Sequence, residues 1–407
     1  MSERVILHCD CNSFYASVEA AINPEYKNVP MAVCGSESDR HGIVLAKNEL
    51  AKKYGIKTAE TVYSAKKKCP NLVIAEPHHD EYLKYSKRVN AIYARYTDLI
   101  EPFGIDESWL DVTASRRIFG SGFEIAEKIR RDVREEIGIT VSIGVSFNKI
   151  FAKLGSDYKK PDAVTVIDRT NFKEIAYPLP VSSLLFVGKK TEVALLSMGI
   201  KTIGALAEAS PSLLNMRFGK VGEMLHNYAT GNDESPVLPV QEEAKSISNG
   251  FTFRHDLIGR NECRVGIEYL SEEIGRRLRS HGMKCGTVAL TIKDEFLHSI
   301  QRQRPQKPPT DLSREIAATA YSILVDVWDE NKPIRMITIA ATNLMKGYAE
   351  QMDLFSDNSD DTNEKSKNRE NAIDKIRQKY GGESIINGAI LDSDIGVYTA
   401  KHKKTGK

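Results

Sequence analysis

The spacing of apolar and polar positions predicts alternating strands and helices in the first part of the chain. The apolar run at 5–11 is typical of a buried strand, and the segment after it has helical spacing with no breaker before Pro24. Two short apolar runs between 100 and 112 flank a Gly-Ile-Asp-Glu-Ser turn, which predicts a hairpin with acids near its bend. The first strand and the helical segment after it predict a strand-to-helix junction at 10–13.

The pattern after the hairpin completes one sheet. Isoleucine or valine recurs every fourth residue from Ile125 to Ile137, which predicts an amphipathic helix that ends at Gly138. From 139 to 146 apolar residues alternate with small polar ones, as in a half-buried strand. We therefore expect a sheet with helices on one face and an open face that carries Asp10 and the hairpin.

Two further regions have mainly helical patterns. Helical stretches between 40 and 70 predict a small basic lobe inserted after the first strand. Residues 168–238 predict short helices with two glycine turns, similar to a helix-hairpin-helix unit whose amides and lysines hold DNA phosphates. Glycine also simply caps helices, so that alternative stays open. The first turn contains Gly188, Lys189 and Lys190.

The C-terminal part begins after a linker with two prolines. Strand-like runs and a basic helix at 272–279 predict a small α/β domain over 245–345. After Leu344 the chain turns polar and acidic, which predicts a flexible tail with one helical patch at 372–380.

Composition sharpens this picture. A chain of 407 residues predicts two to four domains at roughly 150 residues each. The net charge of +2 hides a segment, 245–310, in which twelve Lys/Arg stand against seven Asp/Glu. Such a surplus suits a polyanion, although a solvated surface is the simpler alternative. The six cysteines lack zinc spacing and no apolar run is long enough for a leader or a membrane span, so we expect a reduced, cytoplasmic protein.

Three acids suggest the chemistry. Asp10 ends the first strand, and Asp106-Glu107 lies in the hairpin that the sheet can bring beside it. Converging carboxylates need cations, and hard oxygen ligands without histidine or paired cysteine favour magnesium over zinc. Two such ions can hold the attacking and leaving oxygens of a phosphoryl transfer. Each acid alone could equally be a turn residue or a helix cap.

Three motifs carry a resemblance to a known family. They are Asp-Cys-Asn-Ser-Phe-Tyr-Ala-Ser-Val-Glu at 10–19, Ile-Asp-Glu-Ser-Trp-Leu-Asp at 105–111, and Gly-Val-Ser-Phe-Asn-Lys at 144–149 continued by Lys153, Asp157 and Lys160-Pro161. Together they resemble the lesion-bypass or Y-family DNA polymerases, in particular the UmuC/ImpB group, over roughly residues 1–345.

The resemblance implies an α+β multidomain fold shaped like a right hand. Its parts would be a ferredoxin-like palm (1–12 and 78–167), helical fingers (13–77), a helical thumb (168–238), a small α/β little finger (245–345) and a tail (346–407). It implies low-fidelity DNA synthesis past damaged bases from dNTPs, without proofreading. The implied partners are primer-template DNA and the bacterial sliding clamp. The enzyme itself is expected to be a monomer.

The resemblance also assigns residues. The two Mg²⁺ ions would be held by Asp10, the Cys11 carbonyl, Asp106 and Glu107. The nucleotide would be bound by Ser13, Phe14, Tyr15, Lys52 and Lys160, with Tyr15 as the steric gate against ribose. DNA would contact Gly188, Lys189, Lys190, Arg254, Arg302 and Arg304. Separately, the peptide Gln-Met-Asp-Leu-Phe at 351–355 resembles the bacterial sliding-clamp-binding peptide, which implies that the clamp binds Gln351, Leu354 and Phe355.

One position departs from the family pattern. The family usually has Tyr-x-x-Arg in the first fingers helix, whereas this chain has Glu49-Leu-Ala-Lys52. A glutamate cannot donate to phosphate, which favours weaker nucleotide binding with compensation by Lys47 or Lys53. Two rival functions remain: a pseudo-polymerase that only grips DNA, and another palm-type enzyme such as a nucleotide cyclase.

Overall fold

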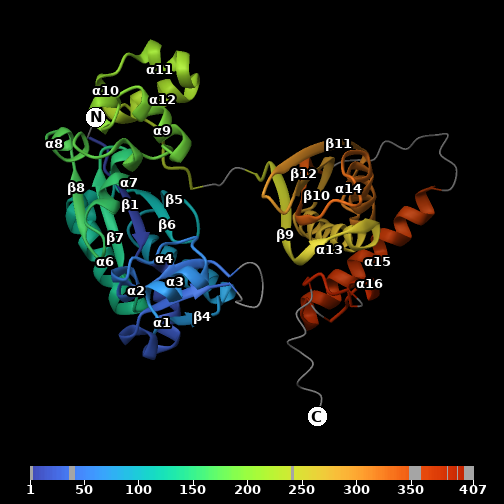
Figure 1. Ribbon diagram of the computed structural model, residues 1–407. Coiled ribbons are helices and arrows are strands. Elements are labelled where there is room, and N and C mark those ends of the chain that lie inside the picture. Colours follow the sequence, from blue (N-terminus) through green and yellow to red (C-terminus); the bar gives the residue numbers. More distant parts are fainter. Residues whose placement is uncertain are drawn as a thin grey trace. The chain divides into compact units, whose positions relative to one another are not determined.

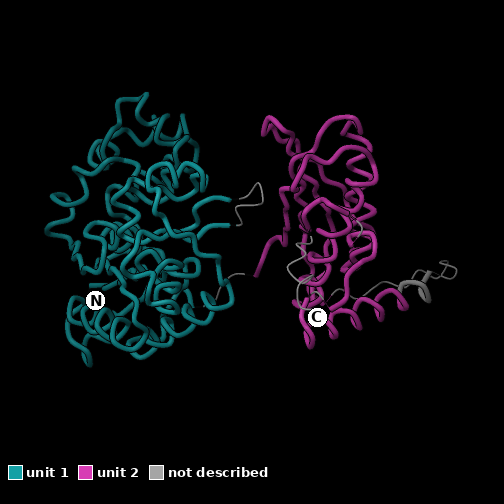
Figure 2. The backbone as a smooth tube through the Cα atoms, turned by 60° about the horizontal axis from the view of Figure 1, so that its bottom comes forward, with its two compact units in different colours: residues 1–37, 42–241 teal, residues 38–41, 242–407 magenta. Residues whose placement is uncertain are grey.

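The computed structural model describes residues 3–35, 42–239, 243–347, 359–382, 384–391 and 393–397 (Figure 1). They form two compact units, one made of the described residues below 240 and the other of those above 242 (Figure 2). The expected α+β multidomain class is confirmed. None of the helices in these ranges is long and apolar enough to cross a membrane.

The first unit is built on a five-stranded sheet in the order β5-β6-β1-β7-β8. The central strand β1 runs antiparallel to both of its neighbours, and all six of its residues are buried, as its apolar run predicts. The predicted hairpin is also present, as β5 and β6. The bounds are β1 Ile6–Cys11, β5 Ile100–Pro102, β6 Glu107–Asp111, β7 Val141–Ser146 and β8 Val164–Ile167.

Helices cover both faces of this sheet, so the expected open face is in large part closed. Helices α4 (His79–Tyr93) and α6 (Gly122–Ile137) pack on the apolar face, and α6 ends at Gly138 as predicted. Helix α7 (Lys149–Tyr158) packs on the other face, where Ala152 joins Ile6 in a small apolar cluster.

Strand β7 is buried along its whole length, and the prediction of a half-buried strand was therefore wrong. Its small residues face α7 instead of water. A Cβ atom on Gly144 would lie 1.9 Å from the carbonyl oxygen of Ala152, so only glycine lets the helix backbone approach this closely. Small polar positions in an alternating pattern here mark helix packing.

The lobe inserted after β1 contains the predicted helices and also a three-stranded sheet, so it is not purely helical. Its sheet has the order β3-β2-β4, with strands of only three or four residues, too short for a recognisable period. The bounds are α1 Phe14–Ile22, η1 Pro24–Asn28, β2 Met31–Cys34, β3 Val44–Lys47, α2 Glu49–Lys53, α3 Val62–Lys68 and β4 Val73–Ala75.

The segment from 168 to 238 folds as the short helices that its pattern predicts. Gly188 precedes the first turn of α9, and Gly199 adopts a φ of 81° between α9 and α10, so both glycine turns are present. The bounds, with α5 of the preceding region, are α5 Arg116–Phe119, α8 Phe172–Ala176, η2 Val181–Ser183, α9 Lys189–Ser197, α10 Ile203–Glu208, α11 Pro211–Phe218 and α12 Lys220–Thr230.

The second unit is an antiparallel sheet in the order β11-β10-β12-β9 with two long helices packed on its apolar face. Its element order is strand, helix, strand, strand, helix, strand, in line with the expected α/β domain. The bounds are β9 Ser246–Leu257, α13 Gly259–Ser280, β10 Met283–Lys293, β11 Ser299–Thr310, α14 Ser313–Val327 and β12 Ile334–Lys346.

The segment expected to be a flexible tail is instead packed on the second unit where it is described. Helix α15 (Ser359–Tyr380) is longer than the predicted patch, and its buried Glu370 contacts Arg279 of α13. After α16 (Gly388–Leu391), Ile395 enters the apolar core of the unit. The prediction failed because ion pairs to α13 help to hold the helix, Arg279–Glu370 being buried, and polar composition does not reveal such pairs. The candidate clamp residues 351–355 lie outside the described residues.

Candidate active site

The three predicted acids meet where β1 and β6 pair. Asp10 and Glu107 are directly opposite each other in the antiparallel register, and the Cys11 backbone N–H donates to the Asp106 carbonyl at 3.0 Å. The hairpin therefore brings Asp106 and Glu107 beside Asp10, as the sequence predicts. The Cys11 thiol is buried in the core, which raises its pKa, so its carbonyl is the group left for a metal.

Two lysines lie against these acids. Lys153 of α7 places its Nζ 3.1 Å from Asp10 Oδ2 and 2.9 Å from Glu107 Oε2. Lys160, two residues beyond α7, places its Nζ 2.6 Å from Asp10 Oδ2. Both also pair with Asp157 of the same helix. The site therefore combines clustered carboxylates with cations that can move to a neighbouring acid.

Burial and the neighbouring negative charges raise the pKa of one of these acids. Burial, followed by the charges of Asp10 and Glu107, raises the pKa of Asp106 to about 6. Burial alone would lower the pKa of the Lys153 ammonium, but Asp10 and the other acids outweigh it and the net shift is upward. The cluster therefore favours any additional positive charge.

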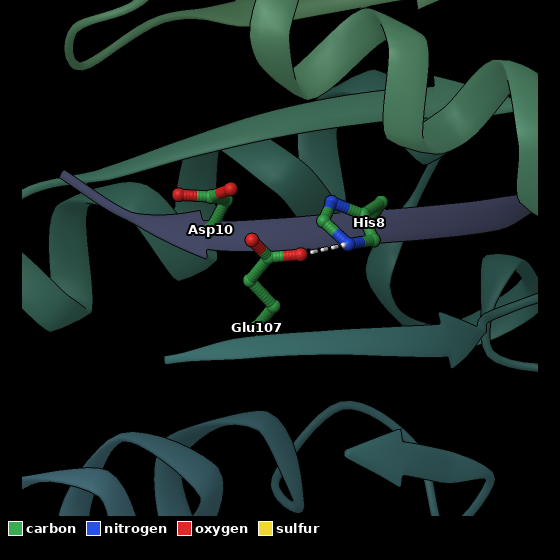
Figure 3. A group of neighbouring side chains, drawn as sticks. All are labelled: His8, Asp10 and Glu107. Atoms are coloured by element: carbon green, nitrogen blue, oxygen red, sulfur yellow. Dashed lines mark ion pairs between the residues drawn. The ribbon is translucent and has the colours of Figure 1, made fainter. Parts of the chain in front are cut away.

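His8 is a fourth member of the cluster that the sequence interpretation missed. It lies two residues before Asp10 on the same face of β1, and its Nε2 is 3.3 Å from Glu107 Oε2 (Figure 3). His8, Asp10 and Glu107 each offer a ligand atom within 4.8 Å of the others. Burial, and then Lys153, lower the pKa of His8 to about 3, so the imidazole is neutral. The period of two along the strand was the signal that could have found it.

The donor set fits a divalent cation. Carboxylates and a backbone carbonyl are the ligands of magnesium, and clustered acids bind it without a dedicated cage. His8 Nε2 is buried and has no hydrogen-bond partner among the described residues, and it lies 3.3 Å from Glu107 Oε2. Buried polar atoms without partners are rare and call for an ion or water.

Comparison with known proteins identifies the family. A family model described as the impB/mucB/samB family matches residues 9–157, and that of its C-terminal domain matches 244–354. The chain belongs to this family. A DNA polymerase IV of Acetivibrio thermocellus is 47% identical over 96% of this chain and 98% of its own. DNA polymerase IV 1 of Bacillus subtilis is 34% identical, covering 96% of this chain and 94% of its own.

A solved structure has the same fold. A chimeric Y-family DNA polymerase built from Dbh and Dpo4 superposes with a TM-score of 0.75, covering 84% of this chain and 100% of that one at 24% identity. The match therefore extends the family assignment from sequence to three-dimensional fold.

The two neighbouring aromatics of the family motif have different environments. Phe14 is buried in the core, whereas Tyr15 is partly exposed and stacks on Tyr82 with ring centroids 4.2 Å apart. The Tyr82 hydroxyl donates to the buried Glu19 at 2.5 Å. Ser13, at the start of α1, has a left-handed backbone with a φ of 46°. Tyr15 is thus held by Tyr82 and remains partly exposed.

The unusual Glu49 pairs with the residue expected to bind phosphate. Its Oε1 lies 3.6 Å from the Nζ of Lys52, one turn along α2, and both side chains are about half exposed. An exposed pair of this kind contributes little, so Lys52 can leave it. Lys47 lies on β3 and donates to Thr58 at 3.2 Å.

The candidate DNA-binding residues differ in availability. Gly188, Lys189 and Lys190 are exposed at the start of α9. Arg254 pairs with Asp394 at 2.7 Å and Arg304 with Asp326 at 2.5 Å, whereas Arg302 is exposed and donates to the Gln301 carbonyl. The two ion pairs are exposed, so they hold Arg254 and Arg304 only weakly.

Proposed function

We propose that this protein is a DNA-directed DNA polymerase that copies past damaged bases, with low fidelity and without proofreading. The observation that supports it best is the convergence of Asp10, Asp106 and Glu107 with Lys160 in a chain of this family. In this proposal the five-stranded sheet is the palm and the lobe after β1 the fingers. The helices from 168 to 238 are the thumb, and 245–345 is the little finger.

The three acids and the Cys11 carbonyl would hold two magnesium ions. Bound magnesium would stabilise the charge that develops as the primer 3′-oxygen attacks the α-phosphorus and pyrophosphate leaves. Lys160 would release Asp10 and turn to the triphosphate. Asp157, which lies 2.7 Å from its Nζ, could stay paired with the ammonium group during this change. Lysine suits this role as a mobile point charge.

Tyr15 would form the floor beneath the deoxyribose. Because its ring is stacked on Tyr82, it cannot retreat easily from a 2′-hydroxyl, and steric exclusion discriminates where affinity alone would not. Lys52 and Ser13 would complete the nucleotide site. Lys189 and Lys190, with the exposed Arg302, would hold primer-template phosphates.

The proposed partner of the C-terminal part is the bacterial sliding clamp. Gln351, Leu354 and Phe355 fit an extended peptide whose two apolar residues anchor it in a hydrophobic pocket. We expect a monomeric cytoplasmic enzyme that dissociates readily from DNA unless the clamp retains it.

Primer extension tests the proposal. With magnesium and four dNTPs, the protein should extend a primer on an undamaged template and on one with an abasic site. Asp106→Ala and Glu107→Ala should lose most extension yet keep DNA binding, measured by fluorescence anisotropy. Asp98→Ala is the matched control, since Asp98 is exposed close by in sequence. DNA binding by the wild type without extension would favour the pseudo-polymerase instead.

A further inference from the structure

The segment that joins the two units is held on the first unit where it begins. The backbone N–H of Leu238 donates to Glu101 Oε2 at 2.8 Å, although 137 positions separate the two residues in the sequence. The side chain of Val237 is only 4% exposed and packs in the small apolar cluster with Ile6 and Ala152. Leu238 itself is 51% exposed. The segment is therefore docked through one backbone group and one buried side chain.

The acceptor of this hydrogen bond is itself fixed. Glu101 lies on β5 opposite Trp109, and its two carboxylate oxygens are 2.6 and 2.7 Å from the Nζ of Lys149. Lys149 begins α7, is 11% exposed, and places its ammonium 4.5 Å from the Trp109 ring centroid. The Trp109 indole N–H donates to the Lys149 carbonyl at 3.0 Å. The carboxylate cannot turn away without leaving a largely buried cation unpaired.

This anchor sets the length of chain that is left to reach the second unit. Seven residues, 239–245, lie between Leu238 and the start of β9. In the described part of the chain, the buried hydrogen bond that precedes this anchor is at the end of α12, where Asn148 donates to the Gly231 carbonyl at 3.0 Å. If the anchor were lost, the joining segment would comprise the fourteen residues 232–245. Docking therefore halves its length.

We propose that Glu101 and Val237 are positioning residues, which hold the joining segment on the first unit and so raise the effective concentration of the second unit at bound DNA. The inference rests on the proposed function, in which both units contact primer-template phosphates. The effective concentration of a tethered group falls as about the −3/2 power of the tether length. Doubling the length therefore lowers it by about threefold. The gain in affinity requires no additional contact with DNA.

Hydrogen exchange with mass spectrometry on the full chain tests the docking. Within 236–239 only Val237 and Leu238 have an amide N–H, because the other two residues are proline. The Leu238 amide should be protected from exchange while Glu101 accepts from it. Val237→Ser, which puts a hydroxyl into the apolar cluster, should remove this protection.

Leu238→Ser is the matched control. It makes a similar change one residue later, at an exposed side chain, and keeps the backbone N–H. We expect it to be protected as the wild type is, both with and without primer-template DNA. Equal protection in Val237→Ser and Leu238→Ser, or loss of the wild-type protection when DNA binds, would overturn the proposal.

Two replacements of Glu101 test the acceptor. Glu101→Gln keeps a carbonyl oxygen that can accept from the Leu238 N–H, so most of the protection should remain. Glu101→Ala removes the acceptor and should release the amide to exchange as Val237→Ser does. Equal protection in the two variants would overturn the role of Glu101.

DNA affinity separates positioning from a merely structural role. The Kd for a primer-template, measured by fluorescence anisotropy, should rise about threefold in Val237→Ser and stay unchanged in Leu238→Ser. In primer extension, the KM for DNA should rise by the same factor, whereas kcat at saturating DNA should not change. A loss of kcat with an unchanged KM would mean that Val237 only supports the fold of the first unit, and the proposal would fail.

These outcomes are distinguishable from failure of the proposed function. Exchange and DNA affinity are measured without nucleotide, so a chain that binds DNA without extending a primer would still show both effects. Normal extension with equal DNA affinity in Val237→Ser and Leu238→Ser would leave the polymerase standing and end this inference.

Discussion

Replacing Glu370 tests whether the C-terminal helix α15 is part of the second unit. Its carboxylate accepts from Arg279, whose side chain is 8% exposed, and from the backbone N–H and hydroxyl of Ser313 at 3.1 and 2.8 Å. Breaking one side of a buried ion pair costs roughly 3–5 kcal/mol. Asp374 still pairs with Arg279 at 2.7 Å, so the lower value applies.

The Glu370 carboxylate also caps the N-terminus of α14, which is far from it in the sequence. Ser313 is the first residue of α14, and loss of its acceptor adds about 1 kcal/mol. Glu370→Ala should therefore destabilise the second unit by about 4 kcal/mol in total, roughly a thousandfold in its opening equilibrium. Hydrogen exchange with mass spectrometry on the full chain reads this out for peptides within 246–346.

The control for this experiment is Glu364→Ala. Glu364 is exposed on the same helix, so its removal should leave exchange in 246–346 nearly unchanged. If Glu370→Ala exchanges no faster than this control, the packing of α15 contributes nothing to stability and the reasoning from buried ion pairs is refuted.

Three further predictions concern the site and its partner. Tyr15→Ala should stay folded and raise the kcat/KM ratio of ribonucleotides over deoxyribonucleotides; an unchanged ratio in an active variant would reject the gate. Because the raised pKa of Asp106, about 6, keeps it protonated at lower pH, magnesium affinity measured calorimetrically should increase from pH 5 to 7. Asp106→Asn should flatten that increase, and a flat wild-type profile contradicts the assignment. Leu354→Ala with Phe355→Ala should abolish sliding-clamp binding without affecting clamp-free extension; equal clamp affinity would disprove the motif.

The sequence predicted the local elements around the acids well, because the strand and hairpin there carry strong periodic signals. Asp10 and Glu107 meet through the pairing of β1 with β6, which the expected sheet allowed but did not specify. The sequence interpretation missed His8, although His8 shares a strand face with Asp10, because a single histidine in an apolar strand is most often a core residue. The role of Lys153 also depends on α7 lying across the sheet, which is a tertiary contact that no local pattern contains.

The docking of the C-terminal segment could not be predicted for a related reason. The contacts that hold it join Glu370 to Arg279 and Arg377 to Glu272 across about a hundred residues of chain. Such pairs are invisible to composition, which sees only a polar, charged stretch. One acid of this stretch, Glu370, in fact neutralises the buried Arg279.

The close approach of α7 to β7 at Gly144 has a consequence for how inactive variants of this protein are interpreted. Because Gly144 has no side chain, α7 can lie close to β7, and this places Lys153 beside Asp10. A single added methyl group should displace the helix from the sheet and lower the activity, without altering any group that takes part in the chemistry. In a random screen for loss of activity, Gly144 should therefore score beside the metal-binding acids. Only a structure can tell such a spacer from a reactant.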